Sequence, residues 1–453
     1  MASDMHNTAP QMLGRTLKAP EGQLPADLLE QAHKAGRSFM CRALAMGAGA
    51  VGAGVASAAT APPVDGDPAT LTLPEHGKSL GQPVAMEGGY GKPSAWEKSI
   101  RRRESPGLTR VPQSSVSFCP LQSLFGIITP CGMHVECHHQ GWWDVDPSQH
   151  RLMINGLVKT PRLFTMDDPM RLPSVSHIHF IECGASSAME WSQPAVPSVQ
   201  YTHGMVSRSE FTGVRLPTLL ELCGSDTRAG RYVLAEGAEG SSMTRTIAMG
   251  NALDGGMIAW GMSGEMLRPE NGYPLRLVAP GVQGVSWVKY LRRIEIGDQP
   301  WFTKDEEMYY IDLMPDGRHR QFTSVQECKS VITTPSVAQT LLDKGFYNVT
   351  GLAWSGRGAI KRVDVSADGG RNWRTARLEG PVLNKALTRF NIDWCSDGSP
   401  AVLQSRAMDS TGCVQPKINQ LHAVRGTKSI HHNNAVQSWR LAETGEVSNV
   451  QIF

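Results

Sequence analysis

The sequence predicts an α+β domain followed by an immunoglobulin-like β-sandwich, and three observations support this fold class. The chain of 453 residues has room for two or three domains. Its 46 Gly, 29 Pro and 11 Trp indicate many turns between strands, a composition that excludes a helical bundle. From about residue 111 to 300, short apolar runs alternate with Gly/Pro turns, and a strand–turn–strand unit with tryptophans follows near residue 360.

The first 60 residues read as a long N-terminal region that ends in an export signal. Arg37 is followed by an Ala/Gly run over residues 43–59, in which Ala56-Ser57-Ala58 forms a small-residue cleavage site. A membrane span would need about 20 strongly apolar residues, so we expect export and no membrane span in the mature chain. The segment resembles a twin-arginine signal in which Ser38 replaces the second arginine. This resemblance implies a periplasmic protein.

An extended arm is expected at residues 61–110, and the first domain at residues 111–327. Residues 216–223 should form a helix, because Pro217 lies in its first turn and Gly224 provides a stop. The expected strands are short apolar sequences bounded by turn residues. Examples are residues 125–129, 151–156, 232–237 and 257–261.

The second domain is expected at residues 328–453, beginning with a strand near Lys329. In its clearest unit, Val363 and Val365 point to one face of a strand. The turn Asp368-Gly369-Gly370 then predicts a hairpin. Together with buried tryptophans at 354 and 373, this unit fits an immunoglobulin-like sandwich. Such modules more often bind or dimerise than catalyse.

Charge and cysteine spacing exclude several classes of protein and site. The 44 basic and 42 acidic residues give a net charge of +2 without a long basic run, so we expect no nucleic-acid partner. Nine cysteines without a CxxC pair exclude a zinc site of the paired type. The CxxCH motif is also absent, so we expect no c-type haem on this chain. If the protein is a redox enzyme, its electrons leave through another protein.

Cys183 is the most informative single residue. A β-like run starting at His177 delivers this thiol into a bend of small residues that ends at Ser187. A bulky group could approach it there, and a thiolate is a soft ligand for transition metals. A buried structural cysteine is the alternative interpretation, because free Cys packs as a small hydrophobe. The local sequence leaves both open.

The order of motifs over residues 85–453 resembles the molybdenum-containing sulfite oxidase family. Within that family, the resemblance is to the molybdenum subunits of bacterial sulfane dehydrogenases. It implies a sulfite-oxidase-type molybdopterin domain followed by an immunoglobulin-like dimerisation domain. The motifs that carry it are Asp146-Pro147, 164–168, 179–183, 202–205, 268–276, 280–284 with Val288-Lys289, the Trp354 and Trp373 hairpin, and 431–439.

The resemblance implies a molybdenum–molybdopterin cofactor that transfers oxygen to a sulfur substrate, either sulfite or a carrier-bound sulfane sulfur. It also implies a c-type cytochrome as electron acceptor, a sulfur-carrier protein that brings the substrate, and a homodimer formed through the C-terminal domain. Cys183 would be the one protein ligand of the metal. The anionic pterin phosphate needs cations and backbone donors, and the residues expected around the cofactor are His139, Ser186, His203, Arg276, Gly281, Gly284 and Lys289.

Three positions depart from the family pattern. Cys137 stands where the family has an active-site arginine, and a thiol cannot replace that bidentate donor. Trp260 stands where the motif has a tyrosine, and indole has no phenolic proton to exchange. Ser186 ends the altered sequence after the metal ligand. We therefore assign Cys183, Cys137 and Trp260 to the catalytic centre.

Two alternatives to a sulfur-oxidising enzyme stay open. One is a cofactor-binding or scaffold subunit of low activity with the same fold, motivated by the lost arginine and tyrosine. The other is a molybdenum-dependent sulfoxide reductase, which shares the cysteine ligand but usually lacks the sandwich domain.

Overall fold

The computed structural model describes residues 90–194, 197–321, 325–429 and 431–453. The predicted export signal and most of the expected arm lie outside these residues. Residues 100–453 belong to one compact unit, and the described residues before them, with the 3₁₀ helix η3 (Ala95–Glu97), belong to another. None of the helices in the described part is both long and apolar enough to span a bilayer.

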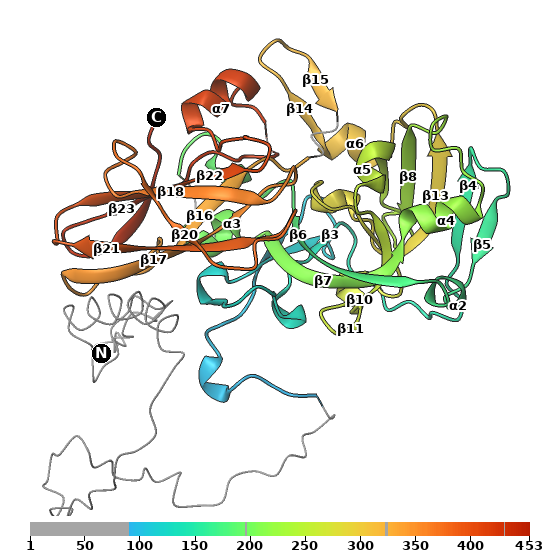
Figure 1. Cartoon of the computed structure of the whole chain (residues 1–453), viewed down its shortest axis with the longest axis horizontal. Helices are drawn as coiled ribbons and strands as arrows, with labels where there is room; N and C mark the ends of the chain where they lie inside the picture. The colour runs from blue at the N-terminus through green and yellow to red at the C-terminus, as the bar shows by residue number, and fades with distance from the viewer. Residues whose placement is uncertain (1–89, 195–196, 322–324, 430) are drawn as a thin grey trace, which may run out of the picture. The chain divides into compact units, whose positions relative to one another are not determined.

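Three sheets form the framework of the first domain, drawn from blue-green to yellow in Figure 1. One sheet has the order β1 (Arg103–Pro106), β2 (Ser115–Phe118), β3 (Cys137–His138). A second has the order β11 (Glu265–Met266), β10 (Met257–Met262), β7 (Val206–Arg215), β6 (Ser174–Glu182), with β12 (Arg276–Val278) also paired to β10. The third has the order β5 (Arg162–Phe164), β4 (Leu152–Gly156), β13 (Leu291–Gly297), β8 (Tyr232–Gly237), β9 (Thr244–Ala248). The parallel pair β4–β13 makes this third sheet mixed.

Short helices connect these strands. In α4 (Leu216–Leu222), Leu216, Leu219 and Leu220 are buried, and Gly224 follows with a left-handed φ of 64°. The α-helices of this part are α2 (Asp167–Met170), α3 (Val199–His203), α4, α5 (Met249–Leu253) and α6 (Lys304–Tyr309). The 3₁₀ helices are η4 (Leu121–Ser123), η5 (Cys131–Met133), η6 (Ala188–Glu190), η7 (Pro269–Asn271) and η8 (Gly284–Ser286). A hairpin of β14 (Ile311–Leu313) and β15 (His319–Gln321) follows α6.

The second domain is a sandwich of two antiparallel sheets, drawn in orange and red in Figure 1. One sheet has the order β16 (Lys329–Thr334), β17 (Gly345–Trp354), β21 (Thr388–Ser396), β20 (Arg377–Leu378). The other has the order β19 (Arg374–Thr375), β18 (Ile360–Ser366), β22 (Ala401–Asp409), β23 (Ser438–Leu441), β24 (Val447–Val450). Trp354 and Trp439 are fully buried in its core, and α7 (Ile418–Arg425) precedes β23.

The predicted fold class is confirmed, and several elements match closely. β8 has the expected bounds, β18 contains Val363 and Val365 as expected, and α4 ends before Gly224 as expected. The strand expected at residues 125–129 is wrong: Gly126 turns the chain with a φ of 67°, and no strand forms there. Trp373 is also not a core residue. The short strand β19, which follows Trp373 directly, lies at a sheet edge. The guanidinium carbon of Arg406 lies 4.4 Å from the centroid of the half-buried Trp373 ring.

Candidate active site

Cys183 follows the last residue of β6, and the bend after it is closed by backbone hydrogen bonds. The Cys183 N–H donates to the Met205 carbonyl at 3.0 Å, and the Ser186 N–H donates to the Cys183 carbonyl at 3.0 Å. A Cβ atom on Gly184 would lie 2.9 Å from Cδ of Gln283, so a larger residue in the bend would require the buried Gln283 side chain to shift. The predicted strand and small-residue bend are therefore present, and they leave Cys183 half-buried.

Cys183 lines a cavity with an empty volume of about 770 Å³, including its open mouth. Six of the ten predicted site residues lie in its wall. They are Cys137, His139, Cys183, Arg276, Gly284 and Lys289.

Two cations face this cavity without a carboxylate partner. Lys289 Nζ donates to the carbonyls of Cys137 at 3.1 Å and Glu270 at 3.2 Å. Burial, together with nearby Arg276, lowers the pKa of Lys289 to about 7. Arg276 donates from Nη1 to the Asn271 carbonyl at 3.0 Å, and burial lowers its pKa to about 10. Within the described residues, neither cation forms an ion pair and Nε of Arg276 has no partner. An anion in the cavity would be stabilised by both.

His138 orients Lys289, a role that the sequence analysis missed. Its Nδ1 lies 2.9 Å from Lys289 Nζ, and its Nε2 lies 3.0 Å from Oε2 of Glu136. Burial and the charge of Lys289 lower the pKa of His138 to about 3, so the ring is neutral. In the tautomer that fits both contacts, Nδ1 accepts from the ammonium and Nε2–H donates to Glu136. The position of His138 next to the predicted His139 was the available clue.

The thiols of Cys137 and Cys183 interact with each other inside the cavity. This interaction, helped by His139 and Lys289, lowers the pKa of Cys137 to about 6 against the effect of burial. The same interaction, together with burial, raises the pKa of Cys183. The residue that replaces the family's arginine therefore faces the predicted metal ligand directly.

Tyr310 provides a phenol that the sequence analysis did not assign to the site. It follows α6, lines the cavity, and its hydroxyl lies 2.9 Å from Nε2 of His139. Burial raises the pKa of Tyr310 well above its ordinary value, and the neighbouring cysteines add to the shift. The hydroxyl therefore stays protonated at neutral pH and is available as a donor. Its position more than 120 residues from Cys183 hid it from motif analysis.

Four predicted residues do not line this cavity. Trp260 lies in the core of the first domain on β10, and His203 is buried with its ring edge-on to Trp354. Ser186 accepts a hydrogen bond at its carbonyl from Lys329 at 3.4 Å, and its hydroxyl has no partner in the described chain. Gly281, with a φ of 84°, abuts Gly356: a Cβ would lie 2.2 Å from the Gly356 carbonyl oxygen. The glycine at 281 thus permits a close approach to the second domain.

Comparison with known proteins assigns this arrangement to a family. Residues 139–304 match the oxidoreductase molybdopterin binding domain, and residues 320–439 match the Mo-co oxidoreductase dimerisation domain. The crystal structure of the sulfane dehydrogenase SoxCD from Paracoccus pantotrophus superposes with a TM-score of 0.81. It is 44% identical, and the match covers 84% of this chain and 98% of that chain. The chain belongs to the sulfite oxidase family.

Other similar proteins are longer than this chain. Mitochondrial sulfite oxidase from Macaca fascicularis is 30% identical over 56% of this chain and 50% of its own length. The nitrate reductase [NAD(P)H] of Hordeum vulgare is 29% identical over 66% of this chain and 37% of its own length. The chain thus spans half or less of the length of these curated relatives. The comparisons confirm the expected family, fold and molybdopterin cofactor class.

The cavity fits the cofactor of this family. Arg276 and Lys289, which lack acidic partners in the described chain, match the negative charge of a pterin phosphate. Gly284 allows the cavity wall to approach the end of β6 closely, because a Cβ there would lie 3.0 Å from the Glu182 carbonyl oxygen. Cys183 offers the soft sulfur atom that a molybdenum centre prefers.

Replacement of Lys289 should change how the stability of the cofactor-free chain depends on pH. The pKa of Lys289 is about 7 in the folded chain and roughly 10.4 in an unfolded one. Between these pH values the unfolded chain binds more protons, so the free energy of unfolding should rise with pH. Denaturant unfolding from pH 7 to 9.5 should show this rise in the wild type and a smaller one in Lys289→Met. Parallel curves for the two proteins would contradict the assignment.

Proposed function

We propose that the chain catalyses the molybdenum-dependent oxidation of a sulfur substrate. The observation that carries the proposal is the cavity in which Cys183 lies beside two cations that have no acidic partner among the described residues. When bound, the cofactor supplies two-electron oxygen transfer to sulfur, and the protein orients it and sets the local field. In this assignment Cys183 is the single protein ligand of the metal.

The other residues of the cavity have separate roles in this proposal. Lys289 and Arg276 hold the anionic part of the pterin, and neutral His138 keeps the Lys289 ammonium directed into the site. The Tyr310 hydroxyl, paired with His139 at 2.9 Å, offers a proton donor in the wall of the cavity. Half-burial of Cys183 limits the access of water to the sulfur ligand.

A sulfane sulfur carried on another protein is the substrate class that Cys137 favours. A guanidinium at this position would bind a free oxyanion such as sulfite in a bidentate manner, whereas a thiol provides no fixed positive charge. The similar SoxCD structure is that of a sulfane dehydrogenase. We therefore infer that a carrier-bound sulfane sulfur is preferred over free sulfite.

Three further properties belong to this proposal. Electrons pass to a c-type cytochrome, a sulfur-carrier protein presents the substrate, and two chains associate through the region that matches the dimerisation domain. The predicted export signal places the enzyme in the periplasm. Light scattering of the purified protein tests the dimer, and reduction of added cytochrome c tests the acceptor.

Metal content and turnover together test the proposal. We expect about one molybdenum atom per chain, a Mo(V) resonance after partial reduction, and substrate-dependent reduction of cytochrome c. A cofactor-binding scaffold is the second candidate, motivated by Cys137, and it would contain molybdenum without turnover on any sulfur donor. A correctly matured sample with no molybdenum would contradict both.

Restoring the family's arginine should shift the substrate preference toward sulfite. In Cys137→Arg, a charge-assisted bond of about 1.5–3 kcal/mol becomes available to the sulfite dianion. We expect kcat/KM for sulfite to rise by roughly 10- to 100-fold relative to the wild type. Cys137→Gln, which adds length without charge, should not reproduce this gain. Equal values for both variants would mean that the missing guanidinium does not determine substrate choice.

A further inference from the structure

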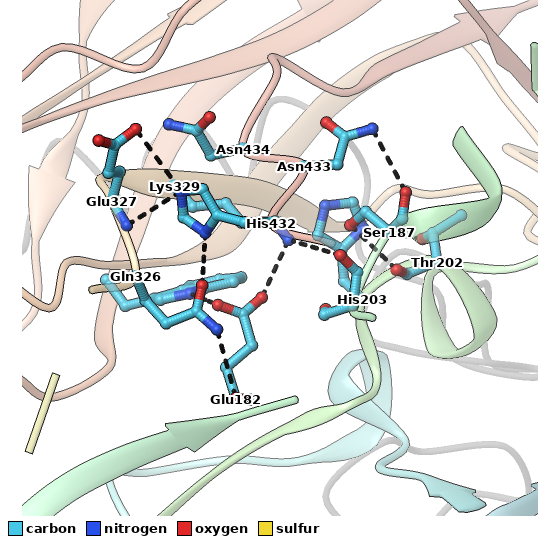
Figure 2. Close-up of polar contacts among 12 residues, drawn as sticks. Glu182, Ser187, Thr202, His203, Gln326, Glu327, Lys329, His432, Asn433 and Asn434 are labelled. Carbon is cyan, nitrogen blue, oxygen red and sulfur yellow. Dashed lines mark hydrogen bonds and ion pairs between the residues drawn. The ribbon is translucent and has the colours of Figure 1, made fainter. Parts of the chain in front are cut away.

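The loop that carries Cys183 is held mainly by residues of the second domain. Figure 2 shows the side chains involved. Glu182 and Ser187 belong to the loop, and their partners include Gln326, Lys329 and Asn433. Hydrogen bonds connect residues 182–187 to residues that lie more than 130 positions later in the chain. They include Lys329 Nζ to Glu182 Oε1 (2.9 Å), Trp354 Nε1 to Glu182 Oε2 (2.9 Å), Gln326 Nε2 to the Glu182 carbonyl (3.4 Å), the His432 N–H to the Gly184 carbonyl (2.7 Å), Lys329 Nζ to the Ser186 carbonyl (3.4 Å) and Asn433 Nδ2 to the Ser187 carbonyl (3.3 Å).

Glu182 is the centre of this network and the residue directly before Cys183. Its side chain is 2% exposed, and each carboxylate oxygen has its own partner, one on Lys329 and one on Trp354. Charge-assisted hydrogen bonds are roughly twice as strong as neutral ones. Because Lys329 lies at the start of β16 and Trp354 at the end of β17, neighbouring strands of the sandwich fix the end of β6.

The remaining bonds fix the loop beyond the cysteine. Three parts of the loop, at Gly184, Ser186 and Ser187, direct their carbonyls to donors of the second domain. Ser187 has a left-handed φ of 65°, a conformation that costs a non-glycine residue energy and persists only where its surroundings hold it. Both flanks of Cys183 are thus held by residues that do not line the cavity.

We propose that Glu182, Lys329 and Trp354, with the support of Asn433, are positioning residues for the metal-binding cysteine. The sandwich domain, which matches a dimerisation domain, then has a further role. It fixes the direction in which the Cys183 thiol enters the cavity. The inference rests on the proposed role of Cys183 as the molybdenum ligand. Partners that orient a metal ligand typically account for 10- to 100-fold in metal affinity.

A pair of tryptophans offers a matched test. Trp354 and Trp439 are both fully buried in the sandwich, and each indole N–H donates one hydrogen bond of 2.9 Å. The bond of Trp354 ends on Glu182, whereas that of Trp439 ends on the Ile332 carbonyl within the sandwich. Replacing either by Phe keeps an aromatic core residue and removes one hydrogen bond. Only Trp354→Phe touches the loop of Cys183.

Three measurements on the full-length variants separate positioning from general stability. Thermal unfolding shows whether the two Phe variants are destabilised to a similar degree. During prolonged dialysis, Trp354→Phe should lose molybdenum roughly 10- to 100-fold faster than the wild type does. Trp439→Phe should lose it at the wild-type rate.

The third measurement needs no metal. In the cofactor-free chain kept under reductant, iodoacetamide should alkylate Cys183 faster in Trp354→Phe than in Trp439→Phe, as read by mass spectrometry of the Cys183 peptide. Asn433→Ala and Asn434→Ala repeat the comparison, because Asn433 binds the loop at Ser187 while Asn434 binds the Cys328 carbonyl.

The outcomes divide clearly. Equal metal loss and equal alkylation in both tryptophan variants would overturn the positioning role and leave a structural one. Wild-type retention and alkylation in Trp354→Phe would also overturn it. If the wild type itself bound no molybdenum, the proposed function would fail, and alkylation of Cys183 alone would then decide whether the sandwich holds the loop.

Discussion

Cys183→Ser should lose molybdenum almost completely while keeping its fold. A serine hydroxyl is a hard and weakly acidic ligand, whereas the thiolate is a soft one that a bound cation readily deprotonates. Because loss of an orienting partner alone typically costs 10- to 100-fold in metal affinity, we expect loss of the ligand itself to exceed about 100-fold. Metal analysis after gel filtration and turnover with a sulfane donor measure the effect.

Cys137→Ser is the matched control for this prediction. Cys137 lines the same cavity as Cys183, but it is not the proposed ligand. This variant should retain about one molybdenum per chain and should change turnover rather than metal content. If Cys137→Ser lost as much metal as Cys183→Ser, the two thiols would have to share the role assigned to Cys183.

The fold was predictable wherever local sequence determines local structure. Alternation of apolar and polar residues defines a strand such as β18, and proline and glycine mark the two ends of α4. The missed segment at residues 125–129 shows where local sequence is insufficient. An apolar run there reads as a strand, but Gly126 turns the chain and Phe125 is left 57% exposed.

The candidate site was predictable where its residues belong to one ordered set of motifs. Cys183, His139, Arg276 and Lys289 all lie in the wall of the cavity, and each lies within or close to an end of a short element. Trp260 was expected there and lies elsewhere, because β10 is covered on both faces and all six of its residues are buried. A continuous apolar run of this kind indicates a buried strand, and that clue was present in the sequence.

The rest of the site depends on contacts between distant parts of the chain. Tyr310 reaches His139 across 171 positions, and Lys329 reaches Glu182 across 147. No periodicity or spacing within a motif encodes such a contact, because it is set by how distant parts of the chain pack. Gly281 illustrates the same point: the close approach of the Gly356 backbone requires a glycine there.

Lys329→Met should destabilise the protein more than any surface substitution. It removes the positive partner of Glu182 from a site where both side chains are almost fully buried, at 3% and 2% exposure. Breaking a buried pair by removing one partner typically costs 3–5 kcal/mol, since the remaining charge has no solvent to compensate it. Denaturant unfolding of the cofactor-free chain should show a lower midpoint with an unchanged slope.

The double variant Lys329→Met with Glu182→Gln distinguishes charge from packing. Replacing both members of a buried pair is often neutral or even stabilising, so the double variant should recover much of the lost stability. It should nevertheless retain molybdenum poorly, because a neutral amide in place of the Glu182 carboxylate accepts only a weaker, uncharged hydrogen bond from Trp354, and both bonds from Lys329 to the loop are gone. Recovery of both stability and metal retention would show that the ion pair contributes to folding without directing Cys183. Recovery of stability without recovery of metal retention would show that Glu182 and Lys329 position Cys183 in addition to stabilising the fold.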